Sequence, residues 1–386
     1  MRNEIYLDNA ATSWPKPPRM IIAMQKFNAL NGANAGRSGH MRSIESAKIT
    51  YETRQRLAML FGLDDPLRIV FSKNITEAIN LVLLGILNAG DHVVTSSMEH
   101  NSVMRPLRYL ASSGIEVSTV RCSAEGKADP EDFRALIQPN TKLICLLHAS
   151  NVVGTIMPVR EVGKIAREHG LLFLVDTAQT AGTIPLAMQT DYIDFLAFTG
   201  HKSLYGPMGT GGVAIGERVD LSMLKPLMMG GTGSHSEFEE QPDFLPDKYE
   251  SGTQNIIGLA GLNTSLVWLE NVGIQEIANH KKNLCQKMID GLMQIEGIRI
   301  YGPKDSNLQT AVVSFIIEGM DNGIVSQTLD EKYGILCRVG LHCAPSAIKT
   351  IQAFPQGTIR FSIGYFNTEA EIDTALQVIQ EISTKR

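Results

Sequence analysis

Short apolar runs alternate along the chain with segments in which apolar residues recur every three to four positions. The uninterrupted runs predict strands that are buried on both faces, at 67–72, 91–97, 141–150, 171–176, 193–200 and 211–216. The periodic segments between them predict helices at 75–87, 102–114 and 158–170. Buried strands joined by helices are typical of a mostly parallel, doubly wound α/β sheet that is covered on both faces.

The pattern changes after about residue 255. A long helical region at 256–295 is followed by an apolar run at 311–319, a glycine-rich loop, a second run at 358–364 and a last helix at 368–383. This order predicts a smaller α+β domain. We expect residues 15–255 to form the large domain, and residues 1–14 and 256–386 to form the small one.

Composition and charge exclude several classes of protein. The 386 residues are 44% hydrophobic and 19% charged, which is an ordinary globular balance and not that of a disordered chain. A net charge of −5 gives no indication of a nucleic-acid or anionic membrane partner. No apolar run approaches the roughly 18 residues of a membrane span, and the first residues lack a signal-peptide core. We therefore expect a cytoplasmic protein.

The cysteines and histidines do not predict a metal site. There are five cysteines, and no two of them have CxxC spacing. No group of His, Cys and Asp has the spacing of metal ligands. An odd number of cysteines in a chain of this kind also argues against a disulfide framework.

Polar side chains follow four of the predicted strands. Asp176 ends one strand and Gln179 comes just after it, His201 and Lys202 follow another, and the polar residues at 148–151 and 99–101 lie at the ends of two more. In an open parallel sheet, ligands bind beyond the carboxyl ends of the strands. Four polar endings at one edge of one sheet therefore predict a binding site there.

A lysine and an aspartate at neighbouring strand ends suit pyridoxal phosphate. A lysine forms a Schiff base with the aldehyde of this cofactor. An aspartate paired with the pyridine nitrogen keeps that nitrogen protonated, so that the ring accepts electrons from the substrate Cα. Lys202 and Asp176 are candidates for these two roles. A structural salt bridge between the two side chains is the alternative.

The segment from Asn74 to Glu77 is a candidate cradle for the phosphate. It lies between a predicted strand and a predicted helix, where Asn74 can cap the helix and Glu77 can close a capping box. The free N–H groups and the Thr76 hydroxyl then face an anion at the positive end of the helix. Helix capping without a ligand is the alternative.

Seven motifs, spread over nearly the whole chain and in family order, resemble the class V aminotransferase group of fold-type I pyridoxal-phosphate enzymes. They are LDNAATS (7–13), NITEAIN (74–80), EHNS (99–102), VDTAQ (175–179), TGHKSLYGPMGTGG (199–212), ESGTQN (250–255) and RVGLHCAP (338–345). Within this group, the R-x-G-x-H-C-A pattern at 338–344 is similar to that of the group II cysteine desulfurases and selenocysteine lyases. The resemblance implies a large domain with a mostly parallel seven-stranded sheet and a smaller α+β C-terminal domain.

The resemblance also implies roles for individual residues. Lys202 is expected to hold the cofactor and to move the Cα proton, with Asp176 on the pyridine nitrogen and His100 stacked on the ring. The remaining cofactor-binding residues are expected to be Ile75, Thr76, Asn151, Gln179, Thr199, His201 and, from a partner subunit, Thr253. The substrate-binding residues are expected to be Arg360, Asn9, Ala10, Arg37 and His40. Because Thr253 is expected to reach the site of a partner subunit, the resemblance implies a homodimer. The polar segment 228–244 is long for a connector and is a candidate dimer or active-site loop.

Cys343 is the candidate nucleophile. It precedes Pro345, which can open a short helix, and the positive end of a helix favours a thiolate. An inert buried cysteine is the alternative, and we expect that state for Cys145 and Cys337. The chain departs from the family pattern at Thr177, at Gln254 and around 36–40, which indicates a divergent branch.

The resemblance implies a cysteine desulfurase that converts L-cysteine to L-alanine and leaves the sulfur on Cys343 as a persulfide. A protein that accepts the sulfur is a further expected partner. Four alternatives stay open: a selenocysteine lyase, another C–S lyase or epimerase, a kynureninase-like hydrolase, and a catalytically silent binding protein.

Overall fold

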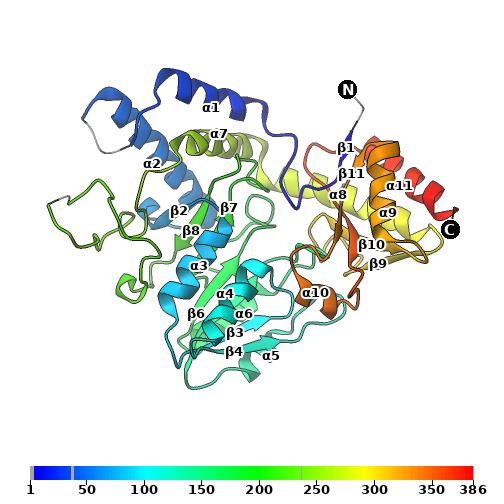
Figure 1. Ribbon diagram of the computed structural model, residues 1–386, viewed down its shortest axis with the longest axis horizontal. Coiled ribbons are helices and arrows are strands. Elements are labelled where there is room, and N and C mark those ends of the chain that lie inside the picture. Colours follow the sequence, from blue (N-terminus) through cyan, green and yellow to red (C-terminus); the bar gives the residue numbers. More distant parts are fainter. Residues whose placement is uncertain (1–3, 36–38, 236, 386) are drawn as a thin grey trace.

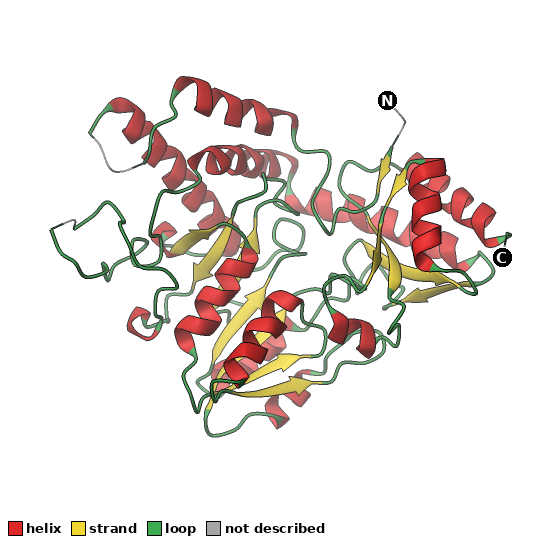
Figure 2. Cartoon of the chain, in the orientation of Figure 1, coloured by secondary structure: helices red, strands yellow, loops and turns green. Residues whose placement is uncertain are grey.

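The computed structural model describes residues 4–35, 39–235 and 237–385, which form two main β-sheets and a short two-stranded sheet, with helices around them (Figure 1). The strands fall into two separate groups, with loops in much of the region between them (Figure 2). None of the described helices is long and apolar enough to cross a membrane.

The larger sheet has seven strands in the order β2–β8–β7–β6–β5–β3–β4. They are β2 (Ile69–Ser72), β3 (His92–Ser96), β4 (Glu116–Val120), β5 (Thr141–Leu147), β6 (Leu172–Asp176), β7 (Phe195–Thr199) and β8 (Gly211–Ile215). Within this sheet, β8 runs antiparallel to both of its neighbours and the other pairs are parallel. The expected mostly parallel sheet is confirmed.

Strand β4 was not predicted from the sequence pattern. It lies at the edge of the sheet and pairs with β3 alone. Of its five residues, Val120 is buried, whereas Glu116 and Thr119 are exposed. A strand of this kind lacks the continuous apolar run of a central parallel strand, because only part of its surface meets the core.

Helices cover both faces of the larger sheet. On one face, α3 (Ile75–Ile86) and α4 (Asn101–Ala111) share a core with Phe195 and Ala197 of β7. On the other face, Leu196 and Phe198 of β7 pack with four helices, which are α2 (Met41–Phe61), α5 (Pro130–Ala135), α6 (Val159–Glu168) and α7 (Ile256–Val272). Helix α1 (Pro18–Leu30) lies outside α7. Successive residues of β7 point to opposite faces, and both faces are covered by helices. Every position in such a strand is therefore buried, which gives an unbroken apolar run in the sequence.

The smaller sheet is antiparallel and has the order β12–β13–β10–β9. Its strands are β9 (Ile298–Tyr301), β10 (Val312–Ile317), β12 (Arg338–Gly340) and β13 (Thr358–Ser362). Around it lie α8 (Ile274–Met293), α9 (Asn322–Tyr333), α10 (Pro345–Thr350) and α11 (Glu369–Ser383). Near the N-terminus, β1 (Ile5–Tyr6) pairs in parallel with β11 (Ile335–Leu336). This part is the α+β unit that the sequence predicted.

The long helical region expected at 256–295 is two helices. Gly273 separates α7 from α8 with a φ of 88°, which glycine adopts without the strain of a Cβ. Leu262 of α7 lies in the core of the large sheet, whereas Leu284 of α8 lies with Leu7 in the core of the small sheet. The division into 15–255 and 1–14 with 256–386 stays a prediction.

Glycines let β8 pass closely between its neighbours. A Cβ on Gly212 would lie 2.2 Å from the carbonyl oxygen of Val70 and 2.8 Å from the ring of Phe198. Neither a strand backbone nor a buried ring can move away without disturbing the sheet.

We therefore expect Gly212→Ala to lower the free energy of unfolding by about 1–3 kcal/mol, because it overpacks the sheet. Urea denaturation measures this change. Gly231→Ala is the matched control, since a Cβ at Gly231 meets no atom within 4 Å, and it should change stability by less than about 0.5 kcal/mol. Equal stabilities of the two variants would contradict this account of β8.

Candidate active site

The polar residues that follow the parallel strands meet at one edge of the large sheet. Leu147 at the end of β5 pairs with Asp176 at the end of β6, and Asp176 pairs with Ala197 of β7. The loops after these strands carry Asn151, His201 and Lys202, as the sequence predicted. The strand register therefore brings residues that are far apart in sequence to the same place.

Asp176 is a buried carboxylate without a cation. Its Oδ1 accepts the Ala178 N–H at 2.8 Å, and it forms no ion pair with any described residue. Burial raises the pKa of Asp176, which the Ala178 N–H and the charge of Lys202 oppose. The salt bridge to Lys202, considered as the alternative, is not formed. A protonated pyridine nitrogen is the kind of partner that this carboxylate lacks.

The side chain of Lys202 is available for chemistry. Its ammonium makes no hydrogen bond or ion pair within the described part of the chain. Burial lowers its pKa to about 8, with Arg360 and Arg338 acting in the same direction and Asp176 against it. A lysine with this pKa is partly neutral at physiological pH, so it can act as a nucleophile and as a base.

His100 is held in its neutral form. It is the N-cap of α4, and its Nδ1 accepts the Ser102 N–H at 3.1 Å. Burial lowers its pKa to about 4, assisted by the positive charges of Lys202 and Arg338. Because Nδ1 is an acceptor, the ring proton is assigned to Nε2. An uncharged ring at this position suits stacking on a cofactor.

The N-terminus of α3 is open to an anion. Asn74 caps the helix by accepting the Glu77 N–H at 3.0 Å, whereas the Glu77 carboxylate accepts the Lys73 N–H at 2.7 Å and so does not form the expected capping box. Thr76 is exposed in the first turn, next to the buried Ile75. Unpaired N–H groups in a first turn are suited to a phosphate.

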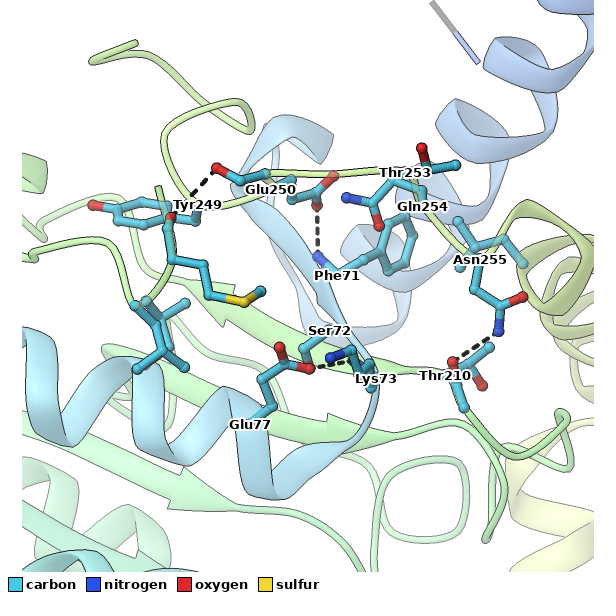
Figure 3. A pocket seen from close by; sticks show the side chains of 16 residues that line it. Phe71, Ser72, Lys73, Glu77, Thr210, Tyr249, Glu250, Thr253, Gln254 and Asn255 are labelled. Atoms are coloured by element: carbon cyan, nitrogen blue, oxygen red, sulfur yellow. Dashed lines mark hydrogen bonds between the residues drawn. The ribbon is translucent and has the colours of Figure 1, made fainter. Parts of the chain in front are cut away.

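Thr199, His201 and Thr253 were also predicted to bind the cofactor, through its phosphate group. Thr199 is buried at the end of β7, and the Nδ1 atom of His201 is buried without a partner. Thr253 is exposed and lines a pocket of about 210 Å³, on the side opposite Lys73 and Glu77 (Figure 3). The phosphate-binding roles of these three residues stay predictions.

Arg360 is the predicted binder of the substrate carboxylate. It lies on β13, is 1% exposed and pairs with Asp8 at 2.7 Å. Its second terminal nitrogen donates to the Asn151 carbonyl at 2.9 Å, and its Nε has no partner. The role of Asp8 was not foreseen, because no local pattern indicates a contact between residues 8 and 360.

Cys343 is the exposed member of five unpaired cysteines. Its carbonyl accepts the Asn101 N–H at 2.9 Å, and the preceding carbonyl of His342 accepts from Asn151 at 2.7 Å. These bonds fasten the cysteine loop to the site. The side chain of Arg338 donates to the Cys343 sulfur at 3.0 Å. The short helix α10 forms as expected, but a guanidinium, which the sequence did not indicate, is the group that contacts the thiol.

The other predicted site residues lie on the N-terminal segment or near α2. The side chain of Asn9 bonds the Ser362 carbonyl and the Trp14 N–H, and the carbonyl of Ala10 accepts from Gln179 at 3.1 Å. His40 is exposed and caps α2 through Ser43. Arg37 lies outside the described residues. The roles of Arg37 and His40 stay predictions.

Pyridoxal phosphate can supply hydrogen-bond partners for the buried polar atoms at this edge of the large sheet. Among the predicted site residues that the structure describes, three have a buried side-chain atom without a partner, namely Asn151 Oδ1, His201 Nδ1 and Arg360 Nε. Leaving buried polar atoms unsatisfied costs free energy. A cofactor with a phosphate and a ring nitrogen, together with an amino-acid carboxylate, would supply partners for these atoms and for Asp176. The described residues contain no group of three or more His, Cys, Asp or Glu that could hold a metal.

Comparisons with known proteins agree with this geometry. The chain is 35% identical over 388 residues to a probable cysteine desulfurase of Methanothermobacter thermautotrophicus, covering 99% of this chain and 96% of the relative. It is 34% identical to one of Pyrococcus abyssi, covering 98% and 94%. An apo cysteine desulfurase of Thermococcus onnurineus has a TM-score of 0.93 at 33% identity, covering 99% of this chain and 95% of the other.

The family model with the description Aminotransferase class-V matches residues 5–375. This match covers both sheets and every strand end described above. The chain belongs to the aminotransferase class-V family of pyridoxal-phosphate enzymes.

Proposed function

We propose that this protein is a cysteine desulfurase that converts L-cysteine to L-alanine and takes up the sulfur on Cys343. The observation that carries the proposal is the Cys343 thiol, which is exposed, contacted by Arg338 and tied by its backbone to the residue after His100. The relatives that match the whole chain are named as probable cysteine desulfurases.

The residues of the site divide the work of substrate binding and proton transfer. Pyridoxal phosphate, when bound, supplies an electron-accepting ring for the substrate Cα. Arg360 binds the substrate carboxylate, for which a guanidinium offers two parallel donors. Lys202, whose pKa burial lowers to about 8, takes the Cα proton in its neutral form. Asp176 would pair with the pyridine nitrogen of the cofactor and keep that nitrogen protonated.

Cys343 then removes the sulfur. Its thiolate attacks the substrate sulfur, a new S–S bond forms, and the Cβ–S bond breaks with its electron pair left on carbon. Protonation of that carbon and return of the Cα proton from Lys202 give L-alanine, and Cys343 is left as a persulfide. A second thiol, from a small molecule or an acceptor protein, takes the sulfur away. A positive donor such as Arg338 stabilises negative charge on the attacking sulfur.

Cys343 also separates this proposal from the alternatives. A C–S lyase or an epimerase needs no thiol nucleophile. Neither reaction would therefore use Cys343 or its contact with Arg338. Selenocysteine would use the same groups as L-cysteine and stays a predicted second substrate. The cytoplasmic location also stays a prediction.

A homodimer is part of the proposal. Large apolar side chains are exposed beside Thr253 and on the nearby loop, with Met229 at 75% and Phe238 at 61% exposure. Met228 lines the same pocket as Thr253. Exposed apolar surface of this kind marks an association site. A second copy of the chain that covers it would bring each Thr253 toward the neighbouring site.

Replacement of the nucleophile gives the first test of this function. Cys343→Ala should lower the rate of alanine formation from L-cysteine about 10³-fold or more, because the attacking group is lost. Alanine and sulfide are measured together in the presence of a reductant, and the wild type should release them in equal amounts. Cys337→Ala is the control and should retain activity. Alanine formation at the wild-type rate by Cys343→Ala would contradict the assignment.

The lowered pKa of Lys202 predicts how cofactor capture depends on pH. A neutral amine attacks the aldehyde, so the rate at which the cofactor-free protein combines with pyridoxal phosphate should rise as pH increases and level off above about 8. Stopped-flow absorbance measures this rate. A rate that keeps rising up to pH 10, as for an ordinary lysine with a pKa near 10.4, would show that burial does not act on Lys202 in this way.

Mixed dimers test the place of Thr253. Thr253→Ala alone should weaken cofactor binding about tenfold, the effect of losing one hydrogen bond to a charged group. Dimers of one Lys202→Ala chain and one Thr253→Ala chain should recover about half of the wild-type activity at limiting cofactor, because one site then has both residues intact. No recovery would place Thr253 in the site of its own chain.

A further inference from the structure

The carbonyl oxygen of His201 is surrounded by donors from one short segment of the N-terminal region. The Lys16 ammonium lies 2.7 Å from this oxygen, the Ser13 N–H 3.0 Å, the Thr12 hydroxyl 3.1 Å and the Ser13 hydroxyl 3.2 Å. A carbonyl oxygen has two lone pairs, so this set exceeds what one acceptor needs. The concentration of donors indicates that the position of this oxygen matters.

Lys16 is an unusual choice for this place. Its ammonium donates to two neutral oxygens, those of His201 and Ser13, and none of the described carboxylates pairs with it. Burial lowers its pKa to about 8. Holding a cation in a partly buried place without an acid costs free energy. Fold stability alone therefore gives no reason for a lysine here.

The oxygen that Lys16 contacts belongs to the peptide bond between His201 and Lys202. A peptide unit is planar and rigid, so fixing this oxygen fixes the direction in which the backbone enters Lys202. The Lys202 carbonyl in turn accepts the Tyr205 N–H at 2.8 Å, and the Gly200 N–H donates to Thr210 at 2.8 Å. The backbone around Lys202 is therefore held from several sides, whereas its ammonium bonds none of the described residues.

The same N-terminal segment also holds the strand that carries the substrate arginine. Asp8 pairs with Arg360 at 2.7 Å, and the Ala10 N–H donates to the Ser362 hydroxyl at 2.9 Å. Residues 8–16 thus connect Arg360 on the small sheet with the turn of Lys202 on the large sheet. In the proposed reaction, these two side chains act on neighbouring atoms of one substrate.

We propose that Lys16 is a positioning residue for Lys202, and that it acts with Thr12 and Ser13 through the His201 carbonyl. This inference rests on the proposed role of Lys202. The charged hydrogen bond from Lys16 sets the place from which the Lys202 amine reaches the cofactor aldehyde and the substrate Cα. Arg360 binds the substrate independently of this bond.

The test compares Lys16→Met, Lys16→Arg and the control Lys225→Met. Lys225 is exposed, and its ammonium also bonds one neutral oxygen, that of Asn88. Three quantities are measured for each variant. They are the rate at which pyridoxal phosphate combines with the cofactor-free protein, the kcat and KM for L-cysteine, and the Tm.

We expect Lys16→Met to lower the combination rate and kcat about 10- to 100-fold, the effect of a misplaced reacting group. KM should change by less than about threefold, because ground-state binding is retained. Lys16→Arg should recover most of both rates, and Lys225→Met should match the wild type. The Tm should be similar for all variants.

Three results would overturn the proposal. One is a Lys16→Met protein that matches Lys225→Met. Another is a rise in KM with kcat unchanged, which would give Lys16 a part in substrate binding. The third is an equal loss in Lys16→Met and Lys16→Arg together with a large fall in Tm, which would make the role one of packing. If the wild type releases no alanine from L-cysteine, the proposed function fails, but the rate of combination with the cofactor still tests Lys16.

Discussion

The geometry of the whole site depends on one buried cation, the guanidinium of Arg360. A charge that is 1% exposed is stable only when it is paired and hydrogen-bonded. Its partners are the Asp8 carboxylate on the N-terminal segment and the Asn151 carbonyl on the loop after β5. The hydrogen bonds of this one side chain therefore join the small sheet and the N-terminal segment to the loop after β5 of the large sheet.

The two sheets contribute different chemical groups to the site. The edge of the large sheet supplies an acid, an amine and a neutral ring, which are Asp176, Lys202 and His100. The small sheet and its loops supply Arg360, Arg338 and Cys343. The backbone hydrogen bond from Asn101 to Cys343 crosses between the two groups. Arg360 and Cys343 from the small sheet and its loops, and Lys202 from the large sheet, are all expected to act on one substrate, so neither sheet forms the site alone.

Positive charge dominates the region where the two sheets meet. Lys202 and Arg338 help to lower the pKa of His100 to about 4, and Arg360 and Arg338 help to lower that of His342 to about 3. In each case burial is the larger cause. Both rings are therefore neutral at physiological pH. An anionic phosphate and a substrate carboxylate would offset this concentration of cations, in agreement with the unpartnered donor of Arg360.

The sequence alone determined where the buried strands lie along the chain and that Asp176 and Lys202 lie at the ends of two of them. This was possible because the carboxyl ends of parallel strands share an edge. It missed the edge strand β4, whose exposed side chains give no apolar run. Only the tertiary structure decided which partners Arg360, Cys343 and His201 have. Asp8 lies 352 residues from Arg360, and Lys16 lies 185 residues from His201. Hydrophobic periodicity reports which side of a local element is buried, and it carries no information on which distant segments meet.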